Sequence, residues 1–527
     1  MDREMNIDPT RAAEEQTRKH ERATIKLKRA QNSLLNVFKL PPEVLGSIFR
    51  WNVTHQSDFG GLDEESHNFL LVCHHWFEVA SRTPELWSFW GNTPDDWARW
   101  CRRSGNAPLD LVLSGDRYNY RYLSDNMWDV LKNRATEDNI RRVHLKSEES
   151  GLISDVIDAL TPTGEELRSD SLESLVLRNL DSFRQVDVSN FFNHYRFPKL
   201  QRLDLTNCGI SSWDYLPART SALTTLKLIY TDSSPTPNPT PTTSQLLSIL
   251  SSNPALRRVA LLGSAIPTDG GGESSRVQLH HLKELQLGGD LRQVLKFLNQ
   301  LDHPRTMDVL TLTLHGCDIT DIPQTIGPYL RDHLQRRDRC QEGLSLFASS
   351  LPIYRAPEIT LSAGDASGID FSAPSPTQIH MFIKIDIVLS GAPRKVVTER
   401  TALDLTTYTP REEVVYFRMS NSHYSKLDVY TRFPNLRALS FDMTSLPAAF
   451  PAPNLVGDGK ILPSLEHVLL KDALVDGNDW SPLVTFLAHR MSSGNRLGTL
   501  VIVHPYDMSP EVTEGIRGMV RELRIEN

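Results

Sequence analysis

The stretch LQRLDLTNCGI, Leu200–Ile210, carries the pattern that decides the fold of this chain of 527 residues. Its residues Leu200, Leu203 and Leu205 stand at the first, fourth and sixth positions. Because successive side chains of a strand point to opposite faces, Leu203 and Leu205 would share one buried face. The side chains between the leucines would then point to the other face. The stretch therefore predicts a short strand with one apolar side.

The same spacing of apolar residues recurs ten times, mostly at intervals of 23 to 33 residues. The matches are IRRVHL from Ile140, LESLVL from Leu172, LQRLDL from Leu200, LTTLKL from Leu223, LRRVAL from Leu256, LKELQL from Leu282, VLTLTL from Val309, LRALSF from Leu436, LEHVLL from Leu465 and LGTLVI from Leu497. An ordinary globular core gives no such period, whereas the leucine-rich-repeat signature L-x-x-L-x-L contributes one short strand per turn of a solenoid. We therefore expect an α/β fold with an irregular leucine-rich-repeat solenoid.

Two repeats continue into the longer form of the pattern, with Cys208 and Cys317 at its Asn-or-Cys position. We expect both side chains to turn inward and to satisfy backbone groups at the bend, which is a structural role. Between residues 320 and 435 the repeats fade, although APEITLSAG, IKIDIVLSG and EEVVYFRMSN read as strands of degenerate repeats. The final SPEVTEGIRGMVREL predicts a capping helix with Ser509 as its N-cap.

Two apolar segments before the repeats predict helices. In LPPEVLGSIFRWNV, Leu40–Val53, the prolines fit a helix start and apolar residues follow with helical spacing. In VCHHWFEVASRTPELW, Val72–Trp87, the four-residue spacing of Val72 and Trp76 predicts an apolar stripe on a helix that stops before Pro84. A core of this size is marginal, so the pair must lean on the rest of the chain or on a partner.

The adjacent His74 and His75 do not predict a metal site. Neighbouring residues on a helix point about 100° apart, whereas paired ligands need a spacing of three or four residues. Cys73 beside His74 fails as a nucleophile and base for the same reason. The chain's five cysteines are widely spaced and form no C-x-x-C, which excludes a disulfide framework and a structural zinc site.

Together the two segments resemble an F-box. The resemblance rests on Leu-Pro-x-Glu-(apolar)-Leu-x-x-Ile-Phe, then Val-Cys-x-x-Trp, then Pro-x-Leu-Trp. Such domains dock onto the Skp adaptor of cullin-based ubiquitin ligases. The resemblance implies that the adaptor-binding residues are Leu40, Pro41, Ile48, Phe49, Val72, Cys73 and Trp76. The segment Thr54–Asn68 departs from the family because it is longer and more polar than usual.

The whole chain resembles the F-box proteins of mushroom-forming fungi. We expect a charged N-terminal helix or tail over 1–35, the F-box over 36–92, a linker helix and first strand over 93–139, and a leucine-rich-repeat-like solenoid over 140–527 with insertions near 233–244 and 267–276. The first of these parts is a solvated helix, a short coiled coil or a docking arm. Its KLKR cluster leaves a nuclear import signal open.

Composition and missing motifs exclude several classes of function. The formal net charge of −8 argues against a nucleic-acid partner. No apolar run is long enough for a membrane span and no signal peptide begins the chain, so a cytoplasmic or nuclear protein is expected. There is no P-loop, no G-x-G-x-x-G, no G-x-S-x-G and no kinase set. We expect no catalysis, no cofactor and no metal.

The resemblance implies a substrate receptor of a Skp–cullin–F-box ubiquitin ligase, and the alternative is a scaffold that binds the adaptor without directing ubiquitination. On strands of the repeat region, the residues between the inward leucines would face a target protein. These include Arg202, Asp204, Glu284 and Gln286. They mix both signs of charge and suit a protein or peptide better than a nucleic acid. A loop at Ser233–Ser244 or the C-terminal end remains a competing site for the target.

Overall fold

The computed structural model describes most of the repeat strands and the N-terminal helices. The described residues are 9–55, 68–90, 102–115, 125–136, 138–161, 167–181, 184–231, 240–267, 276–302, 307, 309–317, 327–328, 344–351, 358–365, 381–389, 414–420, 433–442, 446–450, 462–473, 479–505 and 508–526. The chain forms two compact units, Met1–Leu223 with Ser233–Pro239, and Thr224–Asp232 with Thr240–Asn527. Both contain parallel strands and helices, so the prediction of a mixed α/β fold is confirmed.

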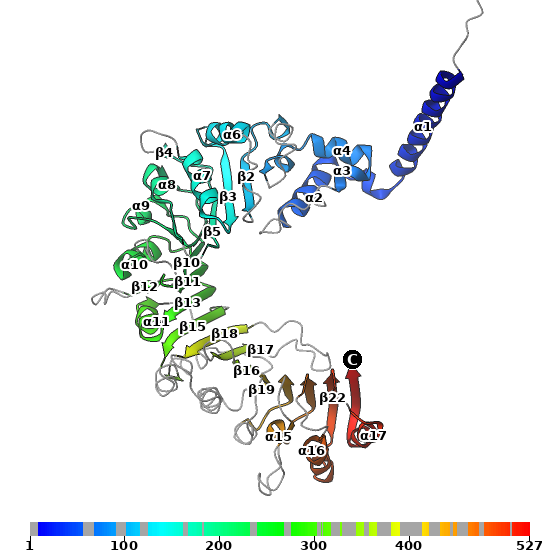
Figure 1. The fold of residues 1–527 in the computed structure, drawn as a ribbon, viewed down its shortest axis with the longest axis vertical. Helices are drawn as coiled ribbons and strands as arrows, with labels where there is room; N and C mark the ends of the chain where they lie inside the picture. The colour runs from blue at the N-terminus through cyan, green and yellow to red at the C-terminus, as the bar shows by residue number, and fades with distance from the viewer. Residues whose placement is uncertain are drawn as a thin grey trace, which may run out of the picture. The chain divides into compact units, whose positions relative to one another are not determined.

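The first unit begins with helices (Figure 1). They are α1 Pro9–Ser33, η1 Asn36–Lys39, α2 Pro42–His55, α3 Phe69–Val72, α4 His74–Ser81 and η3 Pro84–Leu86. Helix α2 starts at Pro42 because a residue without N–H costs nothing in a first turn, where Glu43 also favours the helix dipole. The sequence therefore predicted the start of α2 correctly.

The expected single helix through Val72 and Trp76 is wrong. Cys73 has extended backbone angles, φ −165° and ψ 167°, and separates α3 from α4. Its sulfur accepts a hydrogen bond from the Trp76 N–H at 3.4 Å, so it serves as the N-cap of α4. Val72 and Trp76 consequently lie on different helices and share no stripe.

One apolar core joins these helices to the first strands of the sheet. Its buried members are Leu45, Phe49, Phe69, Val79, Ala80, Leu86, Trp87, Phe89 and Val112. The Trp87 indole N–H donates to the Ala80 carbonyl at 2.7 Å, which satisfies a buried donor. Because Phe89 and Val112 belong to strands, the helices and the sheet edge are held by the same core.

The first unit continues as a parallel sheet. Its strands pair in the order β1 Phe89–Trp90, β2 Leu109–Gly115, β3 Ile140–Ser147, β5 Ser174–Asn179 and β8 Arg202–Thr206. Its helices are α6 Asp125–Thr136, α7 Ser150–Leu160, α8 Ser189–His194 and α9 Leu216–Arg219. Short parallel pairs join β4 Leu167–Arg168 to β7 Tyr195–Arg196, and β6 Val186–Asp187 to β9 Cys208–Gly209. Helix α7 packs on one face of β3 and β5, and the residues that point to the other face of these strands do not contact α7.

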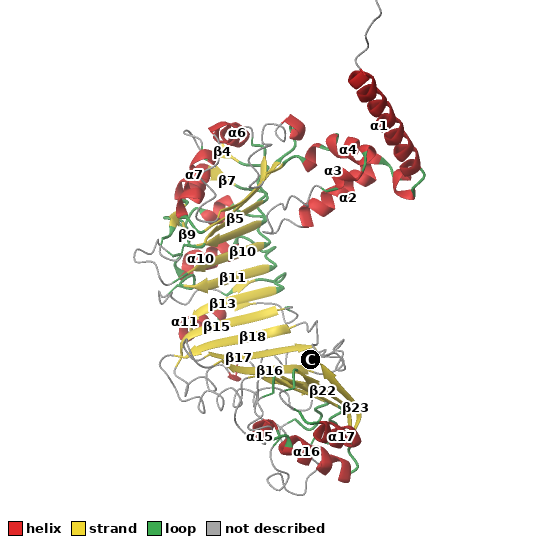
Figure 2. Ribbon diagram, turned by 45° about the vertical axis from the view of Figure 1, so that its right-hand side comes forward, coloured by secondary structure: helices red, strands yellow, loops and turns green. Residues whose placement is uncertain are grey.

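The second unit is also dominated by parallel strands (Figure 2). One run is β10 Thr225–Tyr230, β11 Arg258–Gly263, β13 Glu284–Asp290, β15 Val309–Cys317 and β18 Met381–Leu389. Another is β16 Leu344–Leu351, β19 Val414–Ser420, β20 Ala438–Asp442, β21 His467–Lys471, β22 Leu497–Val503 and β23 Val520–Glu526. Strand β17, Glu358–Asp365, runs antiparallel to β16 and to β18.

Helices return the chain between several of these strands. They are α10 Thr243–Ser251, α11 Leu291–Leu298, α15 Leu446–Ala449, α16 Ser481–Ser492 and α17 Pro510–Met519. The short strands β12 Val277–Gln278 and β14 Leu301–Asp302 pair in parallel beside them. Helix α10 begins with a capping box, in which Thr242 and Gln245 satisfy each other's backbone N–H groups.

The repeat motif marks the core of both units. All ten predicted motifs lie on parallel strands, and their first, fourth and sixth residues are buried except the half-buried Val309. Cys208 is fully buried, and its thiol lies 3.3 Å from the Thr206 carbonyl, as expected for a repeat corner. The identification of these strands as a leucine-rich-repeat solenoid stays a prediction.

Two expectations for the later strands were wrong. The antiparallel β17 interrupts the parallel order, so residues 344–389 are not simply degenerate copies of the repeat. The C-terminal helix begins as predicted, with Ser509 as N-cap, but it ends at Met519 and is followed by β23. Val520 and Leu523 lie opposite Leu497 and Leu500 of β22, so strand pairing wins over the helix pattern of this last segment.

Several predicted features lie outside the described residues. Both proposed insertions fall mainly in the gaps 232–239 and 268–275. Cys101, Cys340 and residues 93–101 of the expected linker helix also lie outside the described residues. The segment Thr54–Asn68 is described only at its two ends, and for Cys317 only the backbone is described.

Candidate functional site

The N-terminal helices carry a surface of exposed apolar side chains. On α2, Val44, Ile48 and Trp51 follow one another at intervals of four and three residues, so they lie along one helical face. Ile48 is 47% exposed and Trp51 62% exposed. Leu45 and Phe49 lie about 100° around α2 from Val44 and Ile48 and belong to the core, so this helix is apolar on two neighbouring faces.

Helix α3 adds two more exposed apolar residues. Leu71 is 84% exposed and Val72 56% exposed, because Cys73 ends the helix and only Phe69 of this segment is buried. The Phe69 ring stacks on Phe49 of α2, with ring centroids 4.5 Å apart. Helices α2 and α3 are therefore packed together, and we call Val44, Ile48, Trp51, Leu71 and Val72 the apolar surface.

The seven residues implied by the F-box resemblance divide into three groups. Pro41, Ile48 and Val72 are exposed, and Leu40, Cys73 and Trp76 are half-buried. Phe49 is 2% exposed and lies inside the core, where Trp76 packs 5.1 Å from it. Phe49 therefore lies in the core, where its ring holds α2 against α3, and its role in adaptor binding stays a prediction.

Three members of the apolar surface were missed by the sequence analysis. Val44 and Trp51 are four residues before and three residues after Ile48, and Leu71 precedes Val72. The helical spacing around Ile48 could have identified the first two. Leu71 could not be found in this way, because its exposure depends on the break at Cys73.

The two adjacent histidines at the start of α4 make local contacts. His74 Nδ1 lies 3.6 Å from a Glu78 carboxylate oxygen on the outside of α4. The His75 ring packs against Phe38, with centroids 5.2 Å apart. Among the described residues, no three His, Cys, Asp or Glu side chains are placed to hold a metal ion.

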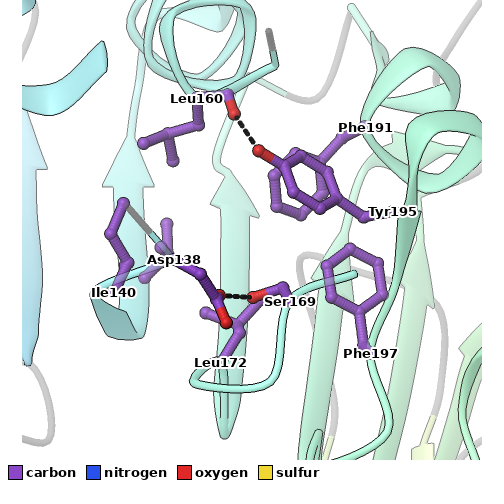
Figure 3. A pocket seen from close by; sticks show the side chains of 9 residues that line it. Asp138, Ile140, Leu160, Ser169, Leu172, Phe191, Tyr195 and Phe197 are labelled. Carbon is purple, nitrogen blue, oxygen red and sulfur yellow. Dashed lines mark hydrogen bonds between the residues drawn. The ribbon is translucent and has the colours of Figure 1, made fainter. Parts of the chain in front are cut away.

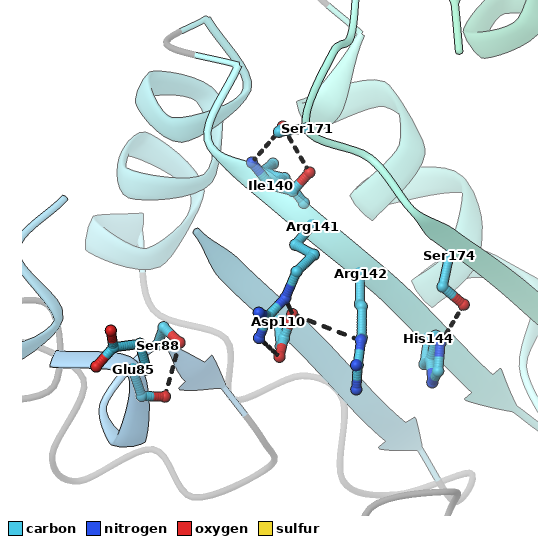
Figure 4. A network of polar contacts seen from close by, with 9 residues as sticks. All are labelled: Glu85, Ser88, Asp110, Ile140, Arg141, Arg142, His144, Ser171 and Ser174. Atoms are coloured by element: carbon cyan, nitrogen blue, oxygen red, sulfur yellow. Dashed lines mark hydrogen bonds and ion pairs between the residues drawn. The ribbon is translucent and has the colours of Figure 1, made fainter. Parts of the chain in front are cut away.

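A second candidate surface is the face of the first unit's sheet that α7 does not cover. Figure 4 shows its first polar network, in which the Arg141 side chain meets the Asp110 carboxylate. Arg141 Nε donates to Asp110 Oδ1 at 2.9 Å, and Arg142 Nε lies 4.0 Å from the same oxygen. Hydrogen bonding to Asp110 raises the pKa of Arg141 above its ordinary value.

Arg202 and Asp204, predicted to face a target, are placed differently by the structure. Asp204 is 1% exposed, and its Oδ2 accepts a hydrogen bond from Arg178 Nη2 at 2.6 Å. Arg202 Nη2 lies 4.0 Å from the same oxygen, and its side chain is 31% exposed. Arg202 can therefore reach a ligand, whereas Asp204 is a buried counter-ion, and the target-binding role of both residues stays a prediction.

The two target residues predicted in the second unit are half-exposed. The Glu284 carboxylate forms an ion pair with Arg258 of the neighbouring strand, with Arg258 Nε 3.0 Å from Glu284 Oε1. Gln286 stands between Ala260 and Thr311 in the strand register. Here opposite charges meet at the surface, so this part of the sheet presents little net charge.

A small cavity in the first unit is lined by residues that include Asp138, Leu160, Ser169 and Tyr195. Its volume of about 20 Å³ matches one or two water molecules. In Figure 3, the Tyr195 hydroxyl donates to the Leu160 carbonyl at 3.0 Å, and Ser169 donates to Asp138 at 2.8 Å. Burial raises the pKa of Tyr195 to about 12, which suits a structural hydroxyl and not an acid–base catalyst.

Cys208, at the Asn-or-Cys position of its repeat, is fully buried. Burial raises the pKa of the Cys208 thiol to about 12.

No described helix combines the length and the hydropathy that crossing a membrane requires.

Comparison with known proteins identifies no family. No protein-family model matches the chain, and no curated protein matches it. Among solved structures, a chain of the mouse RP105/MD-1 complex is similar at 12% sequence identity and a TM-score of 0.28. The match covers 82% of this chain and 64% of that one, so it spans less than two thirds of the other protein.

Proposed function

We propose that this chain is the substrate-recognition subunit of a Skp–cullin–F-box ubiquitin ligase. In this proposal the N-terminal helices bind the Skp adaptor, and through it a cullin, while the strand region holds a target protein. The chain contributes no catalytic group and acts by raising the effective concentration of target lysines near the loaded ubiquitin carrier.

The observation that carries the proposal is the apolar surface on α2 and α3. Five large apolar side chains are exposed within two short helices that are packed on each other. Exposed apolar clusters on soluble proteins mark sites of association, because burying them removes apolar area from water. The F-box pattern of the same segments supports the Skp adaptor as the partner.

The core beneath this surface supports a rigid arrangement. Phe49, Phe69 and Trp76 pack against one another under the exposed residues. A pre-organised surface loses little conformational entropy on binding. An adaptor held there would be coupled to the sheet through the core shared with Val112.

The test is calorimetric binding of the full chain to a purified Skp adaptor. Ile48→Glu with Val72→Glu should weaken binding by at least about tenfold, since each change puts a charge into an apolar contact. The matched control is Leu180→Glu with Met491→Glu, which changes apolar residues of 45% and 46% exposure elsewhere. Equal affinity of the two double variants would refute the proposal. Leu40→Ala with Pro41→Ala should also weaken binding while the strands stay folded.

The alternative function is a scaffold that binds the adaptor without directing ubiquitination. Purification of the chain from its native cells under proteasome blockade separates the two. Recovery of both adaptor and cullin, with ubiquitinated partners that accumulate under the blockade, favours the ligase. Recovery of the adaptor without cullin favours the scaffold.

A further inference from the structure

The face of the first unit's sheet that α7 does not cover gathers charged side chains from four strands. The strand register brings the outward positions of β2, β3, β5 and β8 into rows across the sheet. Six of these positions carry charge, and they are Asp110, Arg142, Lys146, Arg178, Arg202 and Asp204. The sequence alone indicates a mixture of both signs.

The negatively and positively charged side chains of this face differ in their exposure to solvent. Both carboxylate side chains are nearly inaccessible, at 2% exposure for Asp110 and 1% for Asp204. The arginines around them keep 24–33% of their side-chain surface, and Lys146 is half-buried. What this face presents to solvent is therefore positive, with Arg141 at its edge paired to Asp110.

The buried carboxylates position the cations. Asp204 holds the Arg178 guanidinium through Nη2 at 2.6 Å, so part of that fork is fixed before any ligand arrives. A desolvated carboxylate needs a neighbouring cation and hydrogen bonds to offset its lost hydration, and Arg178 supplies both to Asp204. Arg202 and Arg142 lie farther from their carboxylates, at 4.0 Å each.

The spacing of the cations suits a series of anionic groups. Lys146 and Arg178 are register partners on adjacent strands, about 5 Å apart, which is close enough to share one anion. Arg142 and Arg202 flank Ser174 in another row, about 10 Å apart. Val176 in the middle of this face is fully buried, so contact falls on the charged side chains and not on an apolar pocket.

We propose that this basic face, Arg142, Lys146, Arg178 and Arg202, binds an acidic segment of a partner protein. The recognised chemistry is a run of carboxylate or phosphate oxygens on an extended chain. The inference rests on the proposed function in one respect, since the partner would be the target of the ligase. Binding of the segment itself requires only this face.

A nucleic acid fits the face less well. Four strands span about 14 Å, which covers only a few phosphates. The chain's net charge of −8 also opposes the long-range attraction that non-specific nucleic-acid binding depends on. An extended acidic peptide needs neither a long contact nor a basic protein.

The test is fluorescence anisotropy of the full chain with four labelled probes. These are a peptide of about twelve alternating Glu and Ser residues, its Gln–Ser counterpart, its phosphoserine form and an oligonucleotide of equal charge. We expect the acidic and phosphorylated peptides to bind with strong salt dependence and the Gln peptide not to bind. The phosphoserine arm decides whether phosphate or carboxylate is the preferred source of the anion.

The decisive variant is Arg142→Glu with Lys146→Glu. Its matched control is Arg257→Glu with Lys283→Glu, which reverses two exposed cations outside this face. The first pair should weaken peptide binding about tenfold or more, and the control should change it less than about twofold. Arg142→Gln with Lys146→Gln provides a milder variant if the reversal disturbs folding, which thermal melting would show.

Three outcomes overturn the inference. They are no binding of either anionic peptide, equal losses in the two variants, and tighter binding of the oligonucleotide than of the peptides. Adaptor binding, measured on the same variants, should be unchanged. A chain that binds the peptide but no adaptor would refute the proposed function and leave this inference standing. A chain that binds the adaptor but no peptide would refute this inference and leave the proposed function standing.

Discussion

Arg178 on β5 donates to the buried carboxylate of Asp204 on the next strand at 2.6 Å. The two residues come from different repeats, 26 positions apart. Asp204 lies opposite Val176 in the register, so the arginine reaches its partner diagonally across the sheet. The pair fixes a surface cation with a buried anion and ties the two strands together.

Removal of Asp204 should destabilise the fold. We expect Asp204→Ala to lower the free energy of unfolding by about 2–3 kcal/mol, because the partly desolvated Arg178 loses its counter-ion. Glu148→Ala, at an exposed position of the same unit, should change it by less than about 0.5 kcal/mol. Urea unfolding curves of the two variants measure the difference, and similar midpoints would contradict this view of the pair.

Two glycines should respond in opposite directions to alanine. Gly263 has φ +67°, and a Cβ there would lie 1.7 Å from the Tyr230 carbonyl oxygen. Gly263→Ala should therefore destabilise strongly, by more than about 2 kcal/mol. Gly515 lies in α17 with nothing near its Cβ position, so Gly515→Ala should stabilise by up to about 1 kcal/mol. Thermal denaturation should show a lower melting temperature for Gly263→Ala and a higher one for Gly515→Ala than for the parent protein.

Cys208 should make the fold sensitive to alkali. Burial raises the pKa of its thiol to about 12 from an ordinary 9. Because the pKa of this thiol is higher in the folded than in the unfolded state, the folded state keeps its full stability below pH 9. It loses stability as the pH rises from 9 toward 12, where the thiol ionises only in the unfolded chain. Cys208→Ala should be less stable than the parent at pH 7 and should show a weaker decline above pH 9. Parallel alkaline curves for the two proteins would contradict the assignment. Tyr195 contributes a decline of the same sign in both.

The buried guanidinium of Arg490 should stabilise the fold by donating hydrogen bonds to two backbone carbonyls. Its Nη1 donates to the Leu462 carbonyl at 2.6 Å and its Nη2 to the Leu465 carbonyl at 2.8 Å. Burial lowers the pKa of Arg490 to about 10. Arg490→Met keeps the length but leaves both carbonyls unsatisfied, and we expect a loss of about 2–4 kcal/mol. Arg490→Lys should recover only part of it, because an ammonium cannot reproduce the planar fork. Full recovery with Lys would show that charge matters more than geometry.

The parts of the fold that depend on short-range periodicity could be predicted. Leu203 and Leu205 are buried because a strand alternates faces, and the same rule applies in every repeat that the spacing identified. The start of α17 followed from Ser509 and Pro510 in the same way.

The parts that depend on tertiary contacts could not be predicted. Nothing in the local sequence shows that Cys73 adopts an extended conformation, since the apolar spacing continues across it. Strand β23 pairs with β22, and β17 runs antiparallel to β18, and neither pairing can be deduced from the local residue pattern. The burial of Asp204 beside an arginine from another repeat is likewise not visible in the local sequence.

The core that contains Phe89 and Val112 has a practical meaning for dissecting the chain. A fragment that ended near residue 92 would keep the helices but lose Val112, and it would expose one flank of Leu86, Trp87 and Phe89 to water. The smallest piece that can stand alone must therefore extend at least through β2, to Gly115. The same shared core means that these helices are joined to β1 and β2 by packed side chains and not by the connecting backbone alone.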